Sequence, residues 1–138
     1  MMDVDLALLA DAATIDASGK LNILGIFDRL SATSFPTRHP HLSLVLRFAA
    51  GVDEIGRHEV EITLSGPDGG EVVRINGEMN LTPGPGRSGG VVSVPHVLNL
   101  DGLIFPAEGR YSFDVRVDGD HHVSIPLTVQ GPGSMIRA

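Results

Sequence analysis

Hydrophobic and polar residues alternate along most of this chain, as they do in strands that bury one face. The alternation is nearly strict from Leu42 to Phe48, where every second residue is apolar, and it is clearest in the last hairpin, 111–129. The same two-residue period recurs at 60–64, 73–81, 92–100, 111–117 and 123–129. No run of twelve residues has a strong 3.6-residue period, so the pattern predicts an all-β protein without crossover helices.

Turn residues separate these runs. Pro67-Asp68-Gly69-Gly70 and Asp118-Gly119 supply the positive φ angles of tight hairpins, and Asp16 to Lys20 forms a further turn. Pro95 has no N–H donor, which predicts that its strand lies at a sheet edge or is interrupted there. Residues 83–90 are mostly glycine and proline and predict a mobile loop.

The first thirty residues carry a less regular pattern. Leu6, Leu8 and Ala10 alternate with polar or small residues and predict a strand, although Leu9 and the nearby alanines also suit a helix, the weaker alternative. Leu21 to Leu30 is apolar on both faces. Such a strand is either central in its sheet or covered by a loop or a partner.

Together the runs predict a single antiparallel β-sandwich of about seven to eight strands, immunoglobulin-like or a related Greek key. The domain should cover residues 1–130, and residues 131–138 should form a flexible tail. Gly109-x-Tyr111 before an alternating strand resembles the tyrosine corner of such folds, in which the hydroxyl binds backbone across the corner. An ordinary core tyrosine is the alternative.

The charge and cysteine content of the chain limit the classes of molecule that it is expected to bind. The 138 residues carry 10 basic and 17 acidic side chains, a net charge of −7, and no cysteine. This charge disfavours binding to nucleic acid or to an anionic membrane. The first residues lack the features of a signal peptide, and no apolar run reaches membrane-spanning length, so we expect a cytoplasmic protein. Scarce lysine beside abundant arginine, alanine and glycine indicates a bacterial source.

Catalytic motifs are missing from the sequence. There is no Gly-x-Ser-x-Gly motif, and the glycine-rich stretch at 84–90 lacks the Gly-Lys-Ser/Thr ending of a phosphate loop. Aromatic residues make up only 4% and include no tryptophan, which disfavours sugar and single-stranded nucleic-acid platforms. We therefore expect a protein that is not an enzyme and needs no cofactor.

Histidines are the candidates for a Zn²⁺ or Ni²⁺ site, while Asp118 and Asp120, which resemble a fragment of a calcium loop, are explained by turn chemistry. His39 and His41 flank Pro40, so an extended strand would put both side chains on one face, close enough to share a metal. His96, His121 and His122 are weaker candidates, and either His96 or Asp101 would have to supply a third ligand. The alternative is that these histidines are polar surface residues at strand ends.

Apolar residues outside the alternating pattern indicate a contact surface. Leu24, Ile26 and Leu30 belong to the doubly apolar segment, while Phe35 and Phe105 lie in the two links at 34–41 and 101–108. Link residues of this kind either plug the ends of a sandwich, the commoner use, or form a patch. We therefore predict a non-enzymatic module that binds a protein partner or its own copy. The alternative is a small-ligand or metal-binding module that uses the histidines and end loops.

Two segments resemble a known family. Leu8 to Ala13, followed by Gly19 to Asp28, is similar to the opening of the DUF6941 proteins, a bacterial family of unknown function. Phe105 to Phe113 and Val117 to Gly119 fit the closing hairpin of that family, although Pro-x-x-Gly-x-Tyr-x-Phe also occurs in other sandwich domains. The resemblance implies a small all-β domain and implies no activity.

Overall fold

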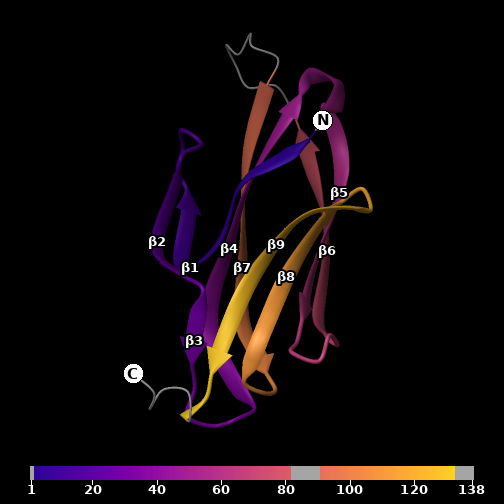
Figure 1. Cartoon of the computed structure of the whole chain (residues 1–138). Helices are drawn as coiled ribbons and strands as arrows, with labels where there is room; N and C mark the ends of the chain where they lie inside the picture. The colour runs from indigo at the N-terminus through magenta and orange to yellow at the C-terminus, as the bar shows by residue number, and fades with distance from the viewer. Residues whose placement is uncertain (1, 82–90, 133–138) are drawn as a thin grey trace.

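The computed structural model describes residues 2–81 and 91–132, which form nine strands and one 3₁₀ turn (Figure 1). The elements are β1 (Asp3–Ile15), β2 (Leu21–Phe27), β3 (Arg29–Ser31), β4 (Thr37–Gly51), η1 (Val52–Glu54), β5 (Gly56–Ser65), β6 (Glu71–Leu81), β7 (Val91–Phe105), β8 (Gly109–Val117) and β9 (Asp120–Gln130). The all-β prediction is therefore confirmed, and residues 3–15 form a strand.

The strands make two sheets. One has the order β2-β1-β4-β7, and the other, which curls like part of a barrel, has the order β3-β9-β8-β5-β6 (Figure 1). The strand pairs are antiparallel except for β3, which runs parallel to β9. The prediction of a purely antiparallel fold with seven to eight strands was wrong in these two respects.

Both differences arise at Asp28. The segment from Leu21 to Leu30 was expected to be one strand, but it ends in the first sheet as β2 and restarts in the second sheet as β3. The Thr128 amide donates to the Asp28 carbonyl at 2.9 Å and begins the parallel pairing with β9. One short segment thus supplies side chains to two sheets: Leu30 of β3 packs against the core, whereas Leu24 and Ile26 of β2 stay exposed.

A single cluster of buried side chains receives residues from both sheets. β4 contributes every second residue from Leu42 to Phe48, and β5 contributes every second residue from Val60 to Leu64. The β8–β9 hairpin contributes its predicted apolar face. In these strands the alternation in the sequence gave the correct inward face. The burial of large apolar side chains provides the main stabilisation of the fold.

In β1 the apolar alternation at Leu6 and Leu8 indicated the strand but does not mark the side that faces the core. Met2 and Val4 contact the core, but farther along the strand it is Ala7 and Leu9 that do so, instead of Leu6 and Leu8. The pairing of β1 with β4 shifts register between Val4 and Leu6. A bulge adds one residue, and because side chains alternate, one extra residue moves every later side chain to the opposite face.

The predicted turns are confirmed. Asp118 and Gly119 have φ angles of 52° and 87°, and Gly69 has a φ of 84°, as tight hairpin turns require. At the first hairpin the Asp16 amide donates to the Lys20 carbonyl at 2.9 Å. Pro95 lies in β7, which is an edge strand of its sheet as predicted.

Tyr111 makes the predicted corner contact. Its hydroxyl donates to the carbonyl of Ala107 at 2.5 Å and accepts from the Ala107 amide at 3.2 Å. The ring packs edge-on against Phe105, with 5.1 Å between ring centroids. The hydroxyl therefore satisfies backbone groups at the entry to β8 while the ring fills the core.

Two predictions concern residues beyond the described ranges. The loop at 83–90 and residues 133–138 of the predicted tail lie outside the described residues. At the start of that tail, the Gly131 amide donates to Glu108 Oε2 at 2.9 Å. Within the described ranges, no helix is long and apolar enough to cross a membrane.

Candidate functional site

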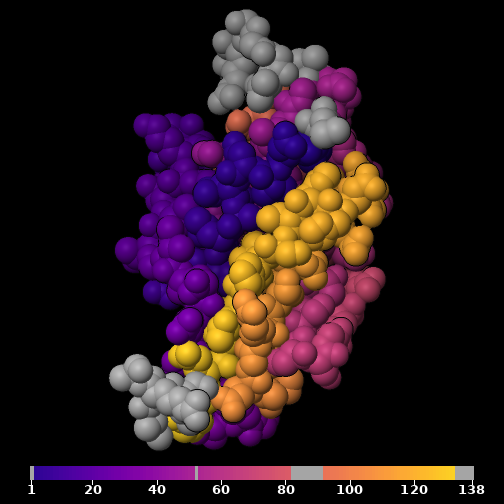
Figure 2. All heavy atoms as spheres, viewed as in Figure 1, coloured from indigo at the N-terminus to yellow at the C-terminus, as the bar shows by residue number. Residues whose placement is uncertain are grey.

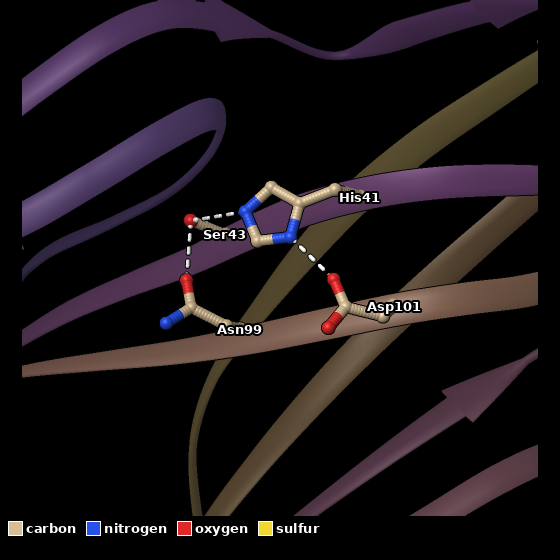
Figure 3. Close-up of polar contacts among 4 residues, drawn as sticks. All are labelled: His41, Ser43, Asn99 and Asp101. Carbon is tan, nitrogen blue, oxygen red and sulfur yellow. Dashed lines mark hydrogen bonds and ion pairs between the residues drawn. The ribbon is translucent and has the colours of Figure 1, made fainter.

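Four polar side chains meet on the two neighbouring strands β4 and β7 (Figure 3). His41 Nδ1 lies 2.5 Å from Asp101 Oδ1, and its Nε2 lies 3.4 Å from Ser43 Oγ. Ser43 Oγ donates to Asn99 Oδ1 at 2.8 Å. The cross-strand partners are His41 with Asp101 and Ser43 with Asn99, so the pairing of β4 with β7 assembles the cluster.

This cluster contains a serine, a histidine and an aspartate in the order of a nucleophile, a base and an orienting group. Its hydrogen bonds run in the wrong direction for that chemistry. A nucleophilic serine gives its proton to the imidazole, whereas the Ser43 hydroxyl donates to Asn99 Oδ1. The 3.4 Å separation from Nε2 is also longer than the hydrogen bond that proton transfer needs.

Burial leads to the same conclusion. Ser43 has no solvent exposure, and its neighbour in β1, Ala10, has none either. A substrate cannot reach the Ser43 hydroxyl in this conformation. The buried hydroxyl is satisfied by Asn99, which avoids the cost of an unpaired buried polar group. The cluster therefore acts as a polar link between two strands, with the His41–Asp101 pair at its exposed end.

The two histidines that flank Pro40 contact different residues. The His39 ring packs against Phe27 with 6.1 Å between centroids, and its Nε2 is buried without a hydrogen-bond partner in the described part of the chain. His41 is paired with Asp101. Because the two rings have different partners, the structure adds no support to a shared metal ion, which stays a prediction.

The remaining metal candidates are also dispersed. His121 Nε2 lies 2.9 Å from Ser124 Oγ, His122 is half-buried beside it, and His96 lies on β7 in the other sheet. Over residues 2–81 and 91–132, no three His, Asp or Glu side chains are grouped so that they could hold a metal ion.

His58 makes a contact that the sequence analysis missed. Its Nδ1 lies 2.6 Å from Asp118 Oδ2, and its Nε2 lies 2.6 Å from the carbonyl of Glu54. The hydrogen bond to Asp118 and the one to Glu54 raise the pKa of His58 above its usual value. The bond from His58, helped by the Glu59 amide, lowers the pKa of Asp118. This pair ties the β8–β9 turn to β5.

The predicted contact residues fall into two groups. Phe105 is fully buried, while Phe35 and Leu30 pack against the core, so these three fill the interior and Phe105 has no surface to offer a partner. Leu24 and Ile26 remain 72% and 66% exposed. Figure 2 shows their hairpin, indigo to purple, as a ridge along one side of the molecule.

β2 is also the terminal strand of its sheet. Its outer edge has no partner strand among the described residues. The seven residues of β2 carry no charge, whereas edge strands usually carry charged residues or proline that block pairing with other chains. The exposed apolar face and the open edge together make β2 the strongest candidate for a binding surface.

Comparison with known proteins identifies the family but gives no activity. The family model described as "Family of unknown function (DUF6941)" matches residues 5–130, nearly the whole chain. The protein belongs to this family, as the two sequence segments indicated. No curated protein matches the chain.

Proposed function

We propose that this protein is a non-enzymatic binding domain that self-associates through the free edge of β2. The observation that carries the proposal is the exposure of Leu24 and Ile26 on an edge strand that bears no charge. Exposed backbone N–H and C=O groups on such an edge can pair with a strand of another chain.

The charges beside β2 favour a second copy as the partner. Two β2 strands related by a two-fold axis run antiparallel, so the same patch serves both copies. If the axis passes Leu24, Lys20 of each copy faces Asp28 of the other, because both residues are equally far from the centre. Both are exposed, and Lys20 is the only lysine of the chain. Opposite charges then flank an uncharged seam, and Leu24 packs against its counterpart.

This dimer should be weak. A single pair of short strands buries less than the roughly 800 Å² per partner of a standard stable interface. The chain also carries a net charge of −7, which opposes association at low ionic strength. We therefore expect a monomer–dimer equilibrium that depends on protein concentration and strengthens with moderate salt.

Light scattering coupled to size exclusion, over a range of concentrations, tests the proposal. The wild-type mass should rise from the 14.6 kDa of one chain towards twice that value. Leu24→Lys should keep the protein monomeric, because it places charge in the seam. Ile104→Lys is the matched control, since Ile104 is a 47% exposed apolar residue of β7, the opposite edge strand.

The register has its own test. Lys20→Asp and Asp28→Lys should each weaken the dimer, and the double substitution should restore it, because the opposite charges are then exchanged. A wild-type protein that stays monomeric at every concentration would refute self-association. A dimer that is insensitive to Leu24→Lys would place the interface elsewhere.

The remaining features fit the same proposal. The two sheets, their shared core and the Tyr111 corner support a β-sandwich of the immunoglobulin-like or a related Greek-key class. The direction of the Ser43 hydrogen bonds supports a role without catalysis. The net charge of −7 supports partners other than nucleic acid or an anionic membrane, and the scarcity of lysine beside abundant arginine supports a bacterial source. A cytoplasmic location belongs to the same proposal.

A further inference from the structure

A cavity of about 200 Å³ lies where the edge strand of one sheet approaches the edge strand of the other. β6 closes one side and β7 the opposite side. Four apolar side chains line most of the wall: Val60, Ile62, Ile75 and Leu98. All four contact the buried cluster or belong to it, so the cavity continues from the core to the surface.

Gly77 keeps this cavity open. It is the cross-strand partner of Val60, so a side chain at position 77 would share the core-facing side of the sheet. A Cβ atom built on Gly77 meets no atom within 4 Å. Its φ angle is not positive, so the backbone does not require glycine there. A glycine inside a strand weakens it and often marks a bulge, a tight bend, or a place where a ligand or another backbone approaches closely. The pairing of β5 with β6 keeps its register at Gly77, which excludes a bulge.

His96 supplies a polar group to this otherwise apolar wall. It pairs with the buried Leu46 in the neighbouring strand, and the residues two positions along β7, Val94 and Leu98, both contact the core. The ring has no hydrogen-bond partner among the described residues. Burial lowers the pKa of His96 below its usual value, so the ring is neutral at neutral pH and can both donate and accept a hydrogen bond.

Size and charge limit what the cavity can hold. A dry cavity of about 150 Å³ is sufficient to bind benzene, so about 200 Å³ suits one ring with a small substituent. Glu78 lines the same cavity and is held by an ion pair with Arg57. A carboxylate at this position disfavours anionic ligands.

We propose that the cavity between β6 and β7 binds a small uncharged molecule with an apolar body of about one ring and a hydroxyl that hydrogen-bonds to His96. The site is separate from the β2 edge, since β2 and β7 are opposite edge strands of their sheet. It would make the protein a carrier or sensor of a phenol-like compound, independently of its oligomeric state.

Three probes of similar size test the proposal: p-cresol, toluene and the anion p-toluate. We expect p-cresol to raise the melting temperature in a saturable manner, because it binds the folded state. It should move the imidazole NMR signals of His96 and leave those of His121 unchanged. Toluene should bind about tenfold more weakly, the equivalent of one hydrogen bond. Binding of p-toluate should be the weakest of the three.

Two variants and one control substitution locate the site. Gly77→Val should fill the cavity and abolish p-cresol binding, while Asn80→Val, an exposed position of the same strand outside the cavity, should leave it intact. His96→Leu should bind p-cresol and toluene equally well. Failure of all three probes to bind the folded wild-type protein would overturn the proposal, as would p-cresol binding that survives Gly77→Val. The preference of p-cresol over toluene in His96→Leu would overturn the role of the imidazole.

Discussion

The first and last hairpins of this protein have similar lengths but differ in how much of their apolar surface is buried. In β8–β9 every second side chain enters the core, and the turn is fastened to β5 through Asp118 and His58. In β1–β2, Leu24 and Ile26 of β2 remain in solvent, and the hydrogen bonds to the Asp16 carboxylate stay within the turn. Both strands of the last hairpin therefore contribute to the core, whereas in the first hairpin β2 leaves two large apolar side chains on the surface.

Truncating one large side chain in each hairpin should give the largest contrast. Phe113 is fully buried in β8, and Phe113→Ala should lower the free energy of unfolding by about 3–5 kcal/mol, because it leaves a cavity. Leu24→Ala in β2 should change it by about 0.5 kcal/mol or less. Urea unfolding of dilute monomer measures both. A large loss for Leu24→Ala would mean that β2 is covered in the monomer.

Replacing one glycine in each hairpin by alanine compares how much stability each backbone position loses. Gly25 in β2 and Gly119 in the β8–β9 turn have φ angles of 72° and 87°, so alanine costs about 1–2 kcal/mol at each. At Gly25 the new Cβ would also lie 2.8 Å from Asp11 Cγ, while at Gly119 it meets nothing within 4 Å. Thermal melting should therefore rank Gly25→Ala as the less stable variant. The reverse order would contradict the close approach of Asp11.

The polar anchors of the two hairpins should also differ in strength. Tyr111→Phe removes the hydroxyl that bonds Ala107 and should cost about 1 kcal/mol while leaving the ring in place. Asp16→Ala removes the acceptor of three bonds, but the carboxylate is fully exposed, so the loss should be smaller. Chemical denaturation of both variants checks this order. Equal losses would show that the corner contact adds little.

The smallest effect concerns pH and the link of the β8–β9 turn to β5. The folded state raises the pKa of His58 above 6.5 and lowers that of Asp118 below 3.8. The stabilisation is thus complete between about pH 4 and 6.5, and it is lost as pH rises through the folded pKa of His58. His58→Gln should cost about 1 kcal/mol or less in that window, because Asp118 is half exposed, and the difference should vanish at higher pH. A pH-independent difference would exclude the ionic contact.

Several parts of this architecture could be predicted because they depend on neighbouring residues only. The inward faces of β4, β5, β8 and β9 follow from strict alternation, and the turn at Asp118-Gly119 follows from the φ angles that these residues tolerate. Pro95 indicated an edge strand because it lacks an N–H donor. Tyr111 indicated its corner through its spacing from Gly109.

The candidate sites were harder to predict because they join strands that are distant in the sequence. His41 and Ser43 stand two residues apart, as do Asn99 and Asp101, and this matched spacing was a signal that the two strands could pair through them. Only the register of β4 against β7 brings the pairs together. The burial of Phe105 could not be predicted either, because its position in a link between strands did not reveal whether it would fill the core or face solvent.

The sequence by itself determined an all-β chain, the core-facing side of most strands, the hairpin turns and the exclusion of cysteine chemistry. These properties depend on side-chain period and local backbone preference. The tertiary structure decided the bulge that reverses the faces of β1, the division at Asp28 into two sheets, and the exposure of Leu24 and Ile26. Such features depend on pairing between distant segments, where a shift of one residue exchanges the buried face for the exposed one.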